Sequence, residues 1–184
     1  MRAVYEACDA ARMEFEFITR SGRKPVRAVR DLAEELLGAW STPGVAREIT
    51  RVHVHRAGSD AVSAVLAPAV RARGFTSERK GLFAGYDVPG LRPDWYLPLG
   101  GGDGVIVEVE RGGVLTNNRD LLDFYKCHIC REANHLFLLA PRAVHGRGSA
   151  AVVKRMRALF AAGVDANVES VAVFGYGDPA AKAA

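Results

Sequence analysis

The amino-acid sequence predicts an α/β fold in which a mixed β-sheet is flanked by helices. Three observations indicate this class. Residues 27–40 and 59–74 repeat their apolar side chains at helical spacing. Short segments rich in Val, Ile and Leu follow residue 80, and helical segments separate the last of them. Hairpin strands followed by helical crossovers build a mixed sheet.

The length fits a single domain. A chain of 184 residues buries enough surface to form one core without disulfides. We expect residues 1–184 to form one domain, in which residues 1–43 are an N-terminal helical addition and residues 58–178 are the core. The core begins with an αβββαβ order, and its full order from residue 59 is α-β-β-β-α-β-α-β.

Capping and breaking residues bound the helices. Ser59 is a good N-cap and Gly74 a good terminator for the helix between them, and Asn117 or Asn118 caps a later one. Residues 41–44 contain Pro and Gly and break the chain. The predicted helices span residues 3–17, 27–40, 59–74, 119–132 and 149–162.

Alternating or continuous apolar patterns mark the strands. Residues 47–56 alternate loosely and favour a short strand. Residues 100–104, which contain four glycines, form a flexible hairpin loop between two later strands. The remaining predicted strands span residues 80–88, 92–99, 105–111, 136–140 and 170–175.

Composition restricts the compartment and the partners. Three cysteines cannot form a disulfide framework, which predicts a reducing, cytoplasmic location. The sequence has no apolar run long enough to span a membrane, and residues 1–20 lack the apolar core of a signal peptide, so we expect neither a membrane span nor a signal peptide. The net charge is +4, and 20 of the 25 cations are arginine, a composition that permits a polyanionic partner without requiring one.

Acidic residues interrupt two strands that otherwise suit a sheet. In residues 105–111, Glu108 and Glu110 point to one face and Val107 and Val109 to the other. The glycine loop folds a third acid, Asp94, back beside Glu108. Like charges this close on one face are unfavourable unless a positive charge lies between them. We therefore expect a hard divalent cation such as Mg²⁺, with Mn²⁺ as a substitute; the alternative is an edge strand whose acidic face is solvated.

These residues resemble the metal site of the PD-(D/E)xK nuclease superfamily. Pro93-Asp94 supplies the "PD", and Glu108-Val109-Glu110 follows after thirteen intervening residues. The pattern is more similar still to restriction endonucleases of the BglII and BamHI type. In that group an "EVE" strand is followed by a turn with Asn residues and by a helix that opens "RDL..F", as residues 117–124 do here.

The resemblance implies a role for each matching residue. Asp94 and Glu108 would bind the metal ion, and the Val109 main-chain carbonyl would be a third ligand. Glu110 stands where most of the superfamily has lysine, so it would act as a general base or position the attacking water. Glu78 is a candidate for an additional acid, although it is equally well explained as part of a charged turn.

Two cations on the predicted helix 119–132 are candidates for binding DNA phosphate. Arg119 lies in the first turn, where the helix dipole opposes a cation, so we expect an anionic partner. That partner is Asp120 or Asp123 locally, or else a phosphate or a carboxylate of the site. Lys126 lies seven residues later on the same face, where it would supply the missing ammonium near the scissile phosphate.

The predicted function is a Mg²⁺-dependent DNA endonuclease of restriction type, which hydrolyses phosphodiester bonds with a metal-activated water. The expected partners are double-stranded DNA, a second copy in a homodimer and a cognate methyltransferase. One alternative is a catalytically inactive, nuclease-fold protein that binds DNA or another partner. Another is a nuclease that acts on RNA or on structured DNA in repair or defence.

Other features that resemble chemical motifs are better explained by structure. Cys127 and Cys130 have C-x-x-C spacing but lack a second pair for zinc, so we expect them to be buried packing residues. His53 and His55 have no third ligand and are expected to be solvated or to face DNA. The cations around the last helix form a solvated or phosphate-contacting cluster: Arg142, Arg147, Lys154, Arg155 and Arg157.

Overall fold

The computed structural model describes residues 13–20, 24–54, 58–77, 81–86, 91–112, 114–143 and 148–177. Its strands form one five-stranded mixed sheet in the order β1-β5-β4-β3-β2. Strands β3, β4 and β5 are parallel, and β1 and β2 are antiparallel to their neighbours at the two edges. The elements are β1 (Glu14–Thr19), α2 (Lys24–Trp40), α3 (Pro43–Val52), α4 (Ser59–Arg71), β2 (Trp95–Gly100), β3 (Asp103–Val109), α5 (Arg119–Ile129), β4 (His135–Pro141), α6 (Ser149–Ala161) and β5 (Ser170–Tyr176).

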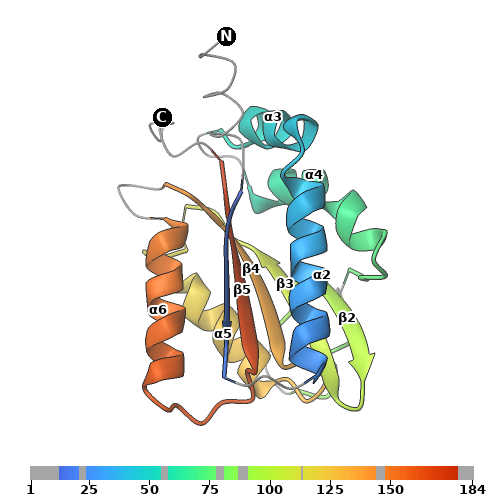
Figure 1. Cartoon of the computed structure of the whole chain (residues 1–184), viewed down its shortest axis with the longest axis vertical. Helices are drawn as coiled ribbons and strands as arrows, with labels where there is room; N and C mark the ends of the chain where they lie inside the picture. Colours follow the sequence, from blue (N-terminus) through green and yellow to red (C-terminus); the bar gives the residue numbers. More distant parts are fainter. Residues whose placement is uncertain are drawn as a thin grey trace.

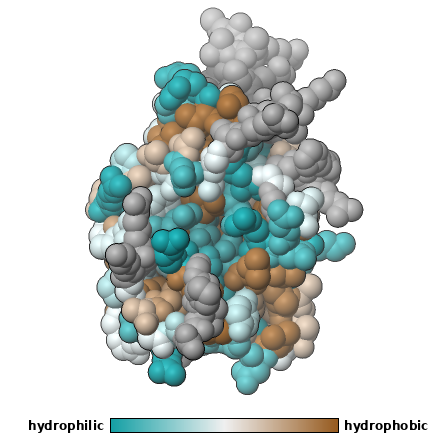
Figure 2. Space-filling view, turned by 180° about the vertical axis from the view of Figure 1, so that it is seen from behind, coloured by the Kyte–Doolittle hydropathy of each residue, from teal (hydrophilic) through white to brown (hydrophobic). Residues whose placement is uncertain are grey.

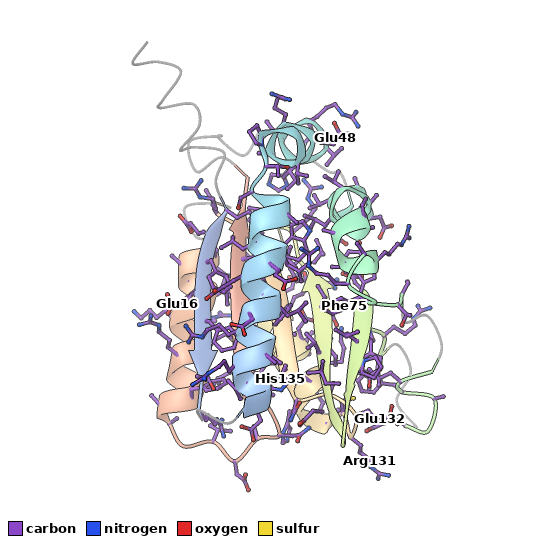
Figure 3. All side chains as sticks on the ribbon, turned by 45° about the vertical axis from the view of Figure 1, so that its right-hand side comes forward. Glu16, Glu48, Phe75, Arg131, Glu132 and His135 are labelled. Carbon is purple, nitrogen blue, oxygen red and sulfur yellow. The ribbon has the colours of Figure 1, made fainter. Side chains whose placement is uncertain are left out.

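Helices cover both faces of the sheet (Figure 1). Helices α2 and α4 pack on the face that carries Val105, Val107 and Val109 of β3, and side chains fill the space beneath them (Figure 3). Helices α5 and α6 pack on the opposite face, which carries Ile106. The alternation of β3 therefore divides the core into two layers, as expected for a sheet that is buried on both sides.

The predicted α/β class, with a mixed sheet and flanking helices, is confirmed. The helices predicted at 27–40, 59–74, 119–132 and 149–162 and the strands predicted at 92–99, 105–111, 136–140 and 170–175 are present within a few residues of the expected bounds. The glycine loop is also confirmed. Gly100, Gly101 and Gly102 have φ values of 88°, 65° and 87°, a region that favours glycine.

The strand predicted at residues 47–56 is wrong, because most of this segment belongs to helix α3. Pro43 lies at the first turn, and the Thr42 hydroxyl accepts a hydrogen bond from the Val45 amide at 3.5 Å. This is a helix N-cap with proline in the first turn. Buried Ile49 lies four residues after Val45 and three before Val52, so the helical period describes this segment better than alternation does.

The helix predicted at residues 3–17 is wrong over residues 14–17, which belong to strand β1, and residues 1–12 lie outside the described residues. In this strand Phe15 and Phe17 alternate with Glu14 and Glu16 and pack into the core beneath α2. Strand β1 pairs with β5, so this part of the chain is an edge of the sheet and the N-terminal addition is not purely helical.

The strand predicted at residues 80–88 is also wrong within the described residues 81–86, which form turns. The Ala84 amide donates to the Gly81 carbonyl at 2.9 Å, and the Tyr86 amide donates to the Phe83 carbonyl at 3.0 Å. Two glycines in this short apolar segment favour turns over a strand. From residue 59 the described core therefore follows an α-β-β-α-β-α-β order, with one strand fewer than the predicted α-β-β-β-α-β-α-β. A bridge among the described residues joins Thr76 to Tyr96 beside β2.

Among the described helices, none combines the length and the apolar character needed to cross a membrane.

Candidate active site

Three acids meet where β2 begins and β3 ends. Trp95 of β2 pairs with Val107 of β3, so the same register, extended by one residue, places Asp94 opposite Glu108. Residues directly opposite in an antiparallel pair point to one face. Glu110 follows two residues after Glu108 and shares that face. The predicted convergence of these three acids on one face is therefore supported by the register.

A backbone hydrogen bond fixes Asp94 against β3. Its Oδ2 accepts a hydrogen bond from the Val109 amide at 2.8 Å. The amide and carbonyl of one strand residue point toward the same neighbouring strand. The Val109 carbonyl therefore lies on the side of β3 where Asp94 is, which suits its predicted role as a main-chain ligand.

Helix α5 places a cation directly on Glu108. Lys126 Nζ lies 2.5 Å from Glu108 Oε1 and 3.1 Å from Asp123 Oδ1, one turn earlier on the helix. It also donates to the Arg92 carbonyl at 3.5 Å. Glu108 and Asp123 are only 4% and 3% exposed. The ammonium that the sequence predicts near the scissile phosphate is thus in contact with Glu108 and Asp123, and its contact with phosphate stays a prediction.

Arg119 faces the third acid. Its Nε lies 3.9 Å from Glu110 Oε2, whereas Asp120 is paired with Arg155 at 2.9 Å. Of the partners considered from the sequence, a carboxylate of the site is therefore the one within ion-pair distance. Asp123 is also attracted by Arg119, which partly offsets the rise in the pKa of Asp123 that burial causes, whereas Asp120 pairs with Arg155. Because 57% of the Arg119 side chain is exposed, the guanidinium can also reach an anion in solvent.

Burial and mutual repulsion raise the pKa values of the acids. Burial, followed by repulsion from Asp123, raises the pKa of Glu110 to about 8, although Arg119 and Lys126 lower it. Burial raises the pKa of Glu108 well above its ordinary value, and repulsion from Asp123 and Asp94 adds to this effect. Burial is also the main cause of the raised pKa values of Asp94 and Asp123. The site therefore favours the binding of additional positive charge.

The donor set fits a hard divalent cation. Among the described residues, no three His, Cys, Asp or Glu side chains are already grouped as the ligands of one metal ion. Mg²⁺ usually takes only one or two carboxylates, together with water and phosphate oxygens, so the facing pair Asp94 and Glu108 suffices. Asp123 Oδ2 is buried and has no hydrogen-bond partner in the described part of the chain. A bound cation would provide a partner for this carboxylate oxygen, which lies beside two other acids.

The structure brings together Asp94, Glu108, Glu110, Arg119 and Lys126, five of the side chains selected from the sequence. Glu78 lies outside the described residues. Sequence reasoning missed the contribution of Asp123 to the site, although its spacing from Arg119 and Lys126 places all three on one helix face. It also missed Asp60, an exposed acid in the first turn of α4 that helps to raise the pKa of Asp94.

The remaining candidate residues have structural partners. Cys127 and Cys130 are buried and unpaired, as expected for packing residues. His53 is half-buried against the ring of Tyr176, with centroids 5.2 Å apart, which corrects its predicted solvation; His55 lies outside the described residues. In the predicted basic cluster, Arg142, Arg155 and Arg157 are paired with Glu14, Asp120 and Glu16, Lys154 is exposed, and Arg147 lies outside the described residues.

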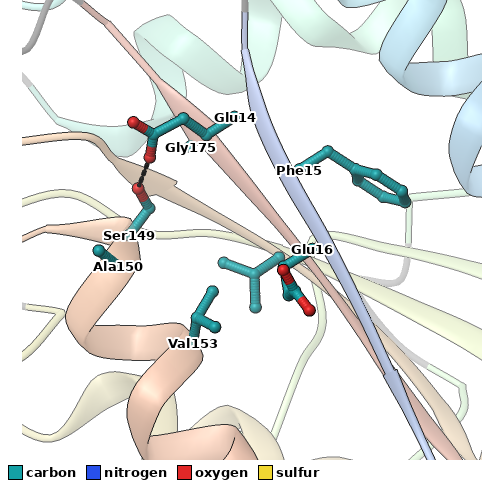
Figure 4. A pocket seen from close by; sticks show the side chains of 8 residues that line it. Glu14, Phe15, Glu16, Ser149, Ala150, Val153 and Gly175 are labelled. Carbon is teal, nitrogen blue, oxygen red and sulfur yellow. Dashed lines mark hydrogen bonds between the residues drawn. The ribbon is translucent and has the colours of Figure 1, made fainter.

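A separate cavity of about 230 Å³ lies between β1 and α6. There the Ser149 hydroxyl donates to Glu14 Oε2 at 2.8 Å (Figure 4). A Cβ atom on Gly175 would lie 2.5 Å from Ser149 Oγ, so this position requires glycine. Because Glu14 also pairs with Arg142, we assign this network to packing of the edge strand.

The molecular face seen from behind has a polar middle, with hydrophobic residues above it and to its lower right (Figure 2). On helix α5, exposed apolar side chains lie beside the charged ones, since Leu122 and Tyr125 are 57% and 54% exposed. The charged face of α5, formed by Arg119, Asp123 and Lys126, is therefore bordered by exposed apolar side chains.

Among the solved structures that are similar to the chain is that of a restriction endonuclease. It is a crystal structure of restriction endonuclease BglII in complex with a DNA 16-mer, with 12% sequence identity, coverage of 90% of this chain and 78% of that chain, and a TM-score of 0.44. The sequence matches no protein-family model and no curated protein. A similarity this low does not support an argument about function, which depends on the residues of the site.

Proposed function

We propose that this protein is a divalent-metal-dependent endonuclease that hydrolyses phosphodiester bonds in double-stranded DNA. One observation carries the proposal. Asp94, Glu108 and Glu110 share one face at the end of the β2–β3 hairpin, and α5 holds the Lys126 ammonium against Glu108. Phosphoryl transfer needs negative ligands for a metal ion and positive groups for the phosphate, and both lie here within a few ångströms.

Asp94 and Glu108 would hold the cation, together with the Val109 carbonyl. Mg²⁺ in this position supplies charge stabilisation at the phosphate and lowers the pKa of water. Glu110 has a pKa of about 8, close to the pH at which a general base works best. It would accept the proton of the attacking water, while Lys126 and Arg119 contact the phosphate oxygens.

Double-stranded DNA is the substrate that the sequence resemblance implies. The matching residues are Pro93-Asp94, Glu108-Val109-Glu110 and the helix opening at residues 117–124. A homodimer would suit a palindromic target, because its two-fold axis would coincide with that of the duplex. In this proposal the enzyme acts in restriction, and a cognate methyltransferase protects the host DNA.

Incubation of supercoiled plasmid with the protein and Mg²⁺ tests the proposal. We expect nicked or linear DNA with wild type, and no cleavage with EDTA or with Glu108→Gln, a variant that keeps the shape of the side chain and removes its charge. Asp103→Asn is the matched control, because Asp103 lies at the opposite end of β3 and should leave cleavage unchanged. Intact plasmid at all metal concentrations, with wild type correctly folded, would contradict the proposal.

A DNA-binding protein without catalytic activity is the second candidate. It is favoured by the absence, among the described residues, of a ready-made group of three metal ligands, and by the occupation of Glu108 by Lys126. In the same experiment this candidate predicts DNA that migrates more slowly but stays intact. Retardation that persists in EDTA and in Glu108→Gln, without cleavage by wild type, would select it.

A further inference from the structure

The Lys126 ammonium has one oxygen acceptor for each of its three N–H bonds. The acceptors are Glu108 Oε1 at 2.5 Å, Asp123 Oδ1 at 3.1 Å and the Arg92 carbonyl at 3.5 Å. Only 13% of the Lys126 side chain is exposed. Two carboxylates and a carbonyl around a largely buried positive atom form a cation site that the protein fills with its own side chain.

The ammonium does not neutralise the whole site. Four acids gather around it: Asp94, Glu108, Glu110 and Asp123. The other cation, Arg119, is mostly exposed and lies 3.9 Å from Glu110. Asp123 Oδ2 is excluded from solvent and accepts no hydrogen bond from the described residues. The negative charge of the acids is therefore only partly neutralised, and the site can accept an ion of higher charge than the ammonium.

We propose that Lys126 is a built-in counter-ion, which fills the cation position of the acidic site in the metal-free protein and releases Glu108 when a divalent cation binds. The inference rests on the proposed function for the identity of the incoming ion, Mg²⁺ or Mn²⁺. An ammonium and a divalent cation repel each other strongly when they share one carboxylate in a poorly solvated site. The two cations therefore compete for Glu108.

Competition predicts effects of opposite sign when Lys126 is removed. Without divalent ions, the loss of the ammonium leaves buried acids uncompensated and lowers thermal stability. In the presence of divalent ions, the same loss removes the competitor and strengthens metal binding. A lysine that only supports the fold would change stability in the same direction but would leave metal affinity unchanged or weaker.

Calorimetric titration with Mn²⁺ distinguishes these cases. We expect Lys126→Met to bind Mn²⁺ at least about tenfold more tightly than wild type does. In EDTA, its melting temperature should be lower than that of wild type. On addition of Mn²⁺, its melting temperature should increase by more than that of wild type does. Lys154→Met is the matched control, because Lys154 is an exposed lysine on α6 and should leave both measurements unchanged.

Lys126→Gln keeps the hydrogen-bonding ability without the charge and takes the place of Lys126→Met if that variant does not fold in EDTA. Equal or weaker Mn²⁺ binding by the folded variants would overturn the inference, as would a failure of both to fold even in about 10 mM Mn²⁺. The readout is independent of cleavage. Tighter binding without any cleavage by wild type would contradict the proposed function alone, whereas cleavage by wild type with weaker binding by the variants would contradict this inference alone.

Discussion

At the scale of single residues, the site is defined by acids that the fold keeps in an unfavourable environment. Glu108 and Asp123 are almost fully buried and share a single ammonium, and Glu110 lies close enough to Asp123 for repulsion to raise its pKa. Such arrangements cost stability and are concentrated at functional sites. An acid of this site whose folded pKa is raised should therefore stabilise the protein when it is replaced by a neutral residue.

Glu110→Gln tests the free-energy cost of an ionised Glu110 through the pH dependence of the stability of the protein. The folded pKa of about 8 exceeds the ordinary 4.5, so the folded state favours the protonated form, and wild type loses stability as the pH rises from 4.5 toward 8. The variant cannot ionise and escapes this loss. Urea unfolding in EDTA should give equal stabilities near about pH 5 and a gain of about 1–3 kcal/mol for the variant near about pH 9, after allowance for partial solvation. An equal difference at both pH values would contradict the assignment, and Glu34→Gln, an exposed acid on α2, is the control.

Arg119→Gln tests the electrostatic link between α5 and Glu110. Attraction by Arg119 lowers the pKa of Glu110, so its removal should raise that pKa above 8. Carboxyl-carbon NMR of the metal-free protein measures the titration directly. We also expect the midpoint of the pH–activity profile to move to higher pH. An unchanged Glu110 titration would show that the 3.9 Å separation carries no useful interaction.

At the scale of elements, helix α5 and the β2–β3 hairpin position the site. Three charged residues, Arg119, Asp123 and Lys126, follow helical spacing on one face, so the sequence predicts that Arg119 and Lys126 lie on the same side of the helix. The role of Lys126 toward phosphate stays a prediction. Asp123 follows the same spacing, but the sequence indicates it only as a candidate local partner of Arg119. The hairpin was predicted from its glycines, and its register brings Asp94 opposite Glu108.

A pair of glycine substitutions tests how tightly the hairpin is packed. A Cβ atom on Gly104 would lie 2.3 Å from the Glu132 carbonyl oxygen and 2.7 Å from Tyr96 Cε2, whereas one on Gly38 of α2 would meet nothing within 4 Å. Gly104→Ala should destabilise the protein by about 1–3 kcal/mol. Gly38→Ala should stabilise it by about 0.5–1 kcal/mol, because alanine favours a helix. Urea unfolding measures both, and a neutral Gly104→Ala would show that the hairpin is free to shift.

At the scale of the whole molecule, local patterns predicted the mixed sheet and its flanking helices, but pairing between distant segments was not predictable. The sequence predicts a helix where strand β1 lies, because the alternation of β1 covers only a few residues and its partner β5 lies far along the chain. The sequence predicts a strand over segment 81–86, because its apolar residues suit either a strand or packed turns. A long-range pairing therefore decided the first case, whereas local turn hydrogen bonds decided the second.

Divalent cations should stabilise the entire molecule if they bind at the acidic site. For a dissociation constant of about 1 mM, about 10 mM Mg²⁺ contributes roughly 1.4 kcal/mol, which corresponds to an increase of roughly 3–5 °C in melting temperature for a chain of this size. Thermal unfolding measures the increase. It should disappear in a double variant, Asp94→Asn with Glu108→Gln, and an equal increase in that variant would place the bound ions elsewhere.

The location of the metal ion is the most direct test of the account. Anomalous scattering from a crystal equilibrated with Mn²⁺ should reveal a peak between the carboxylates of Asp94 and Glu108, with the Lys126 ammonium moved away from Glu108. A crystal without a peak at these carboxylates, at Mn²⁺ concentrations that saturate other binding sites, would contradict the central claim that these acids form a cation site.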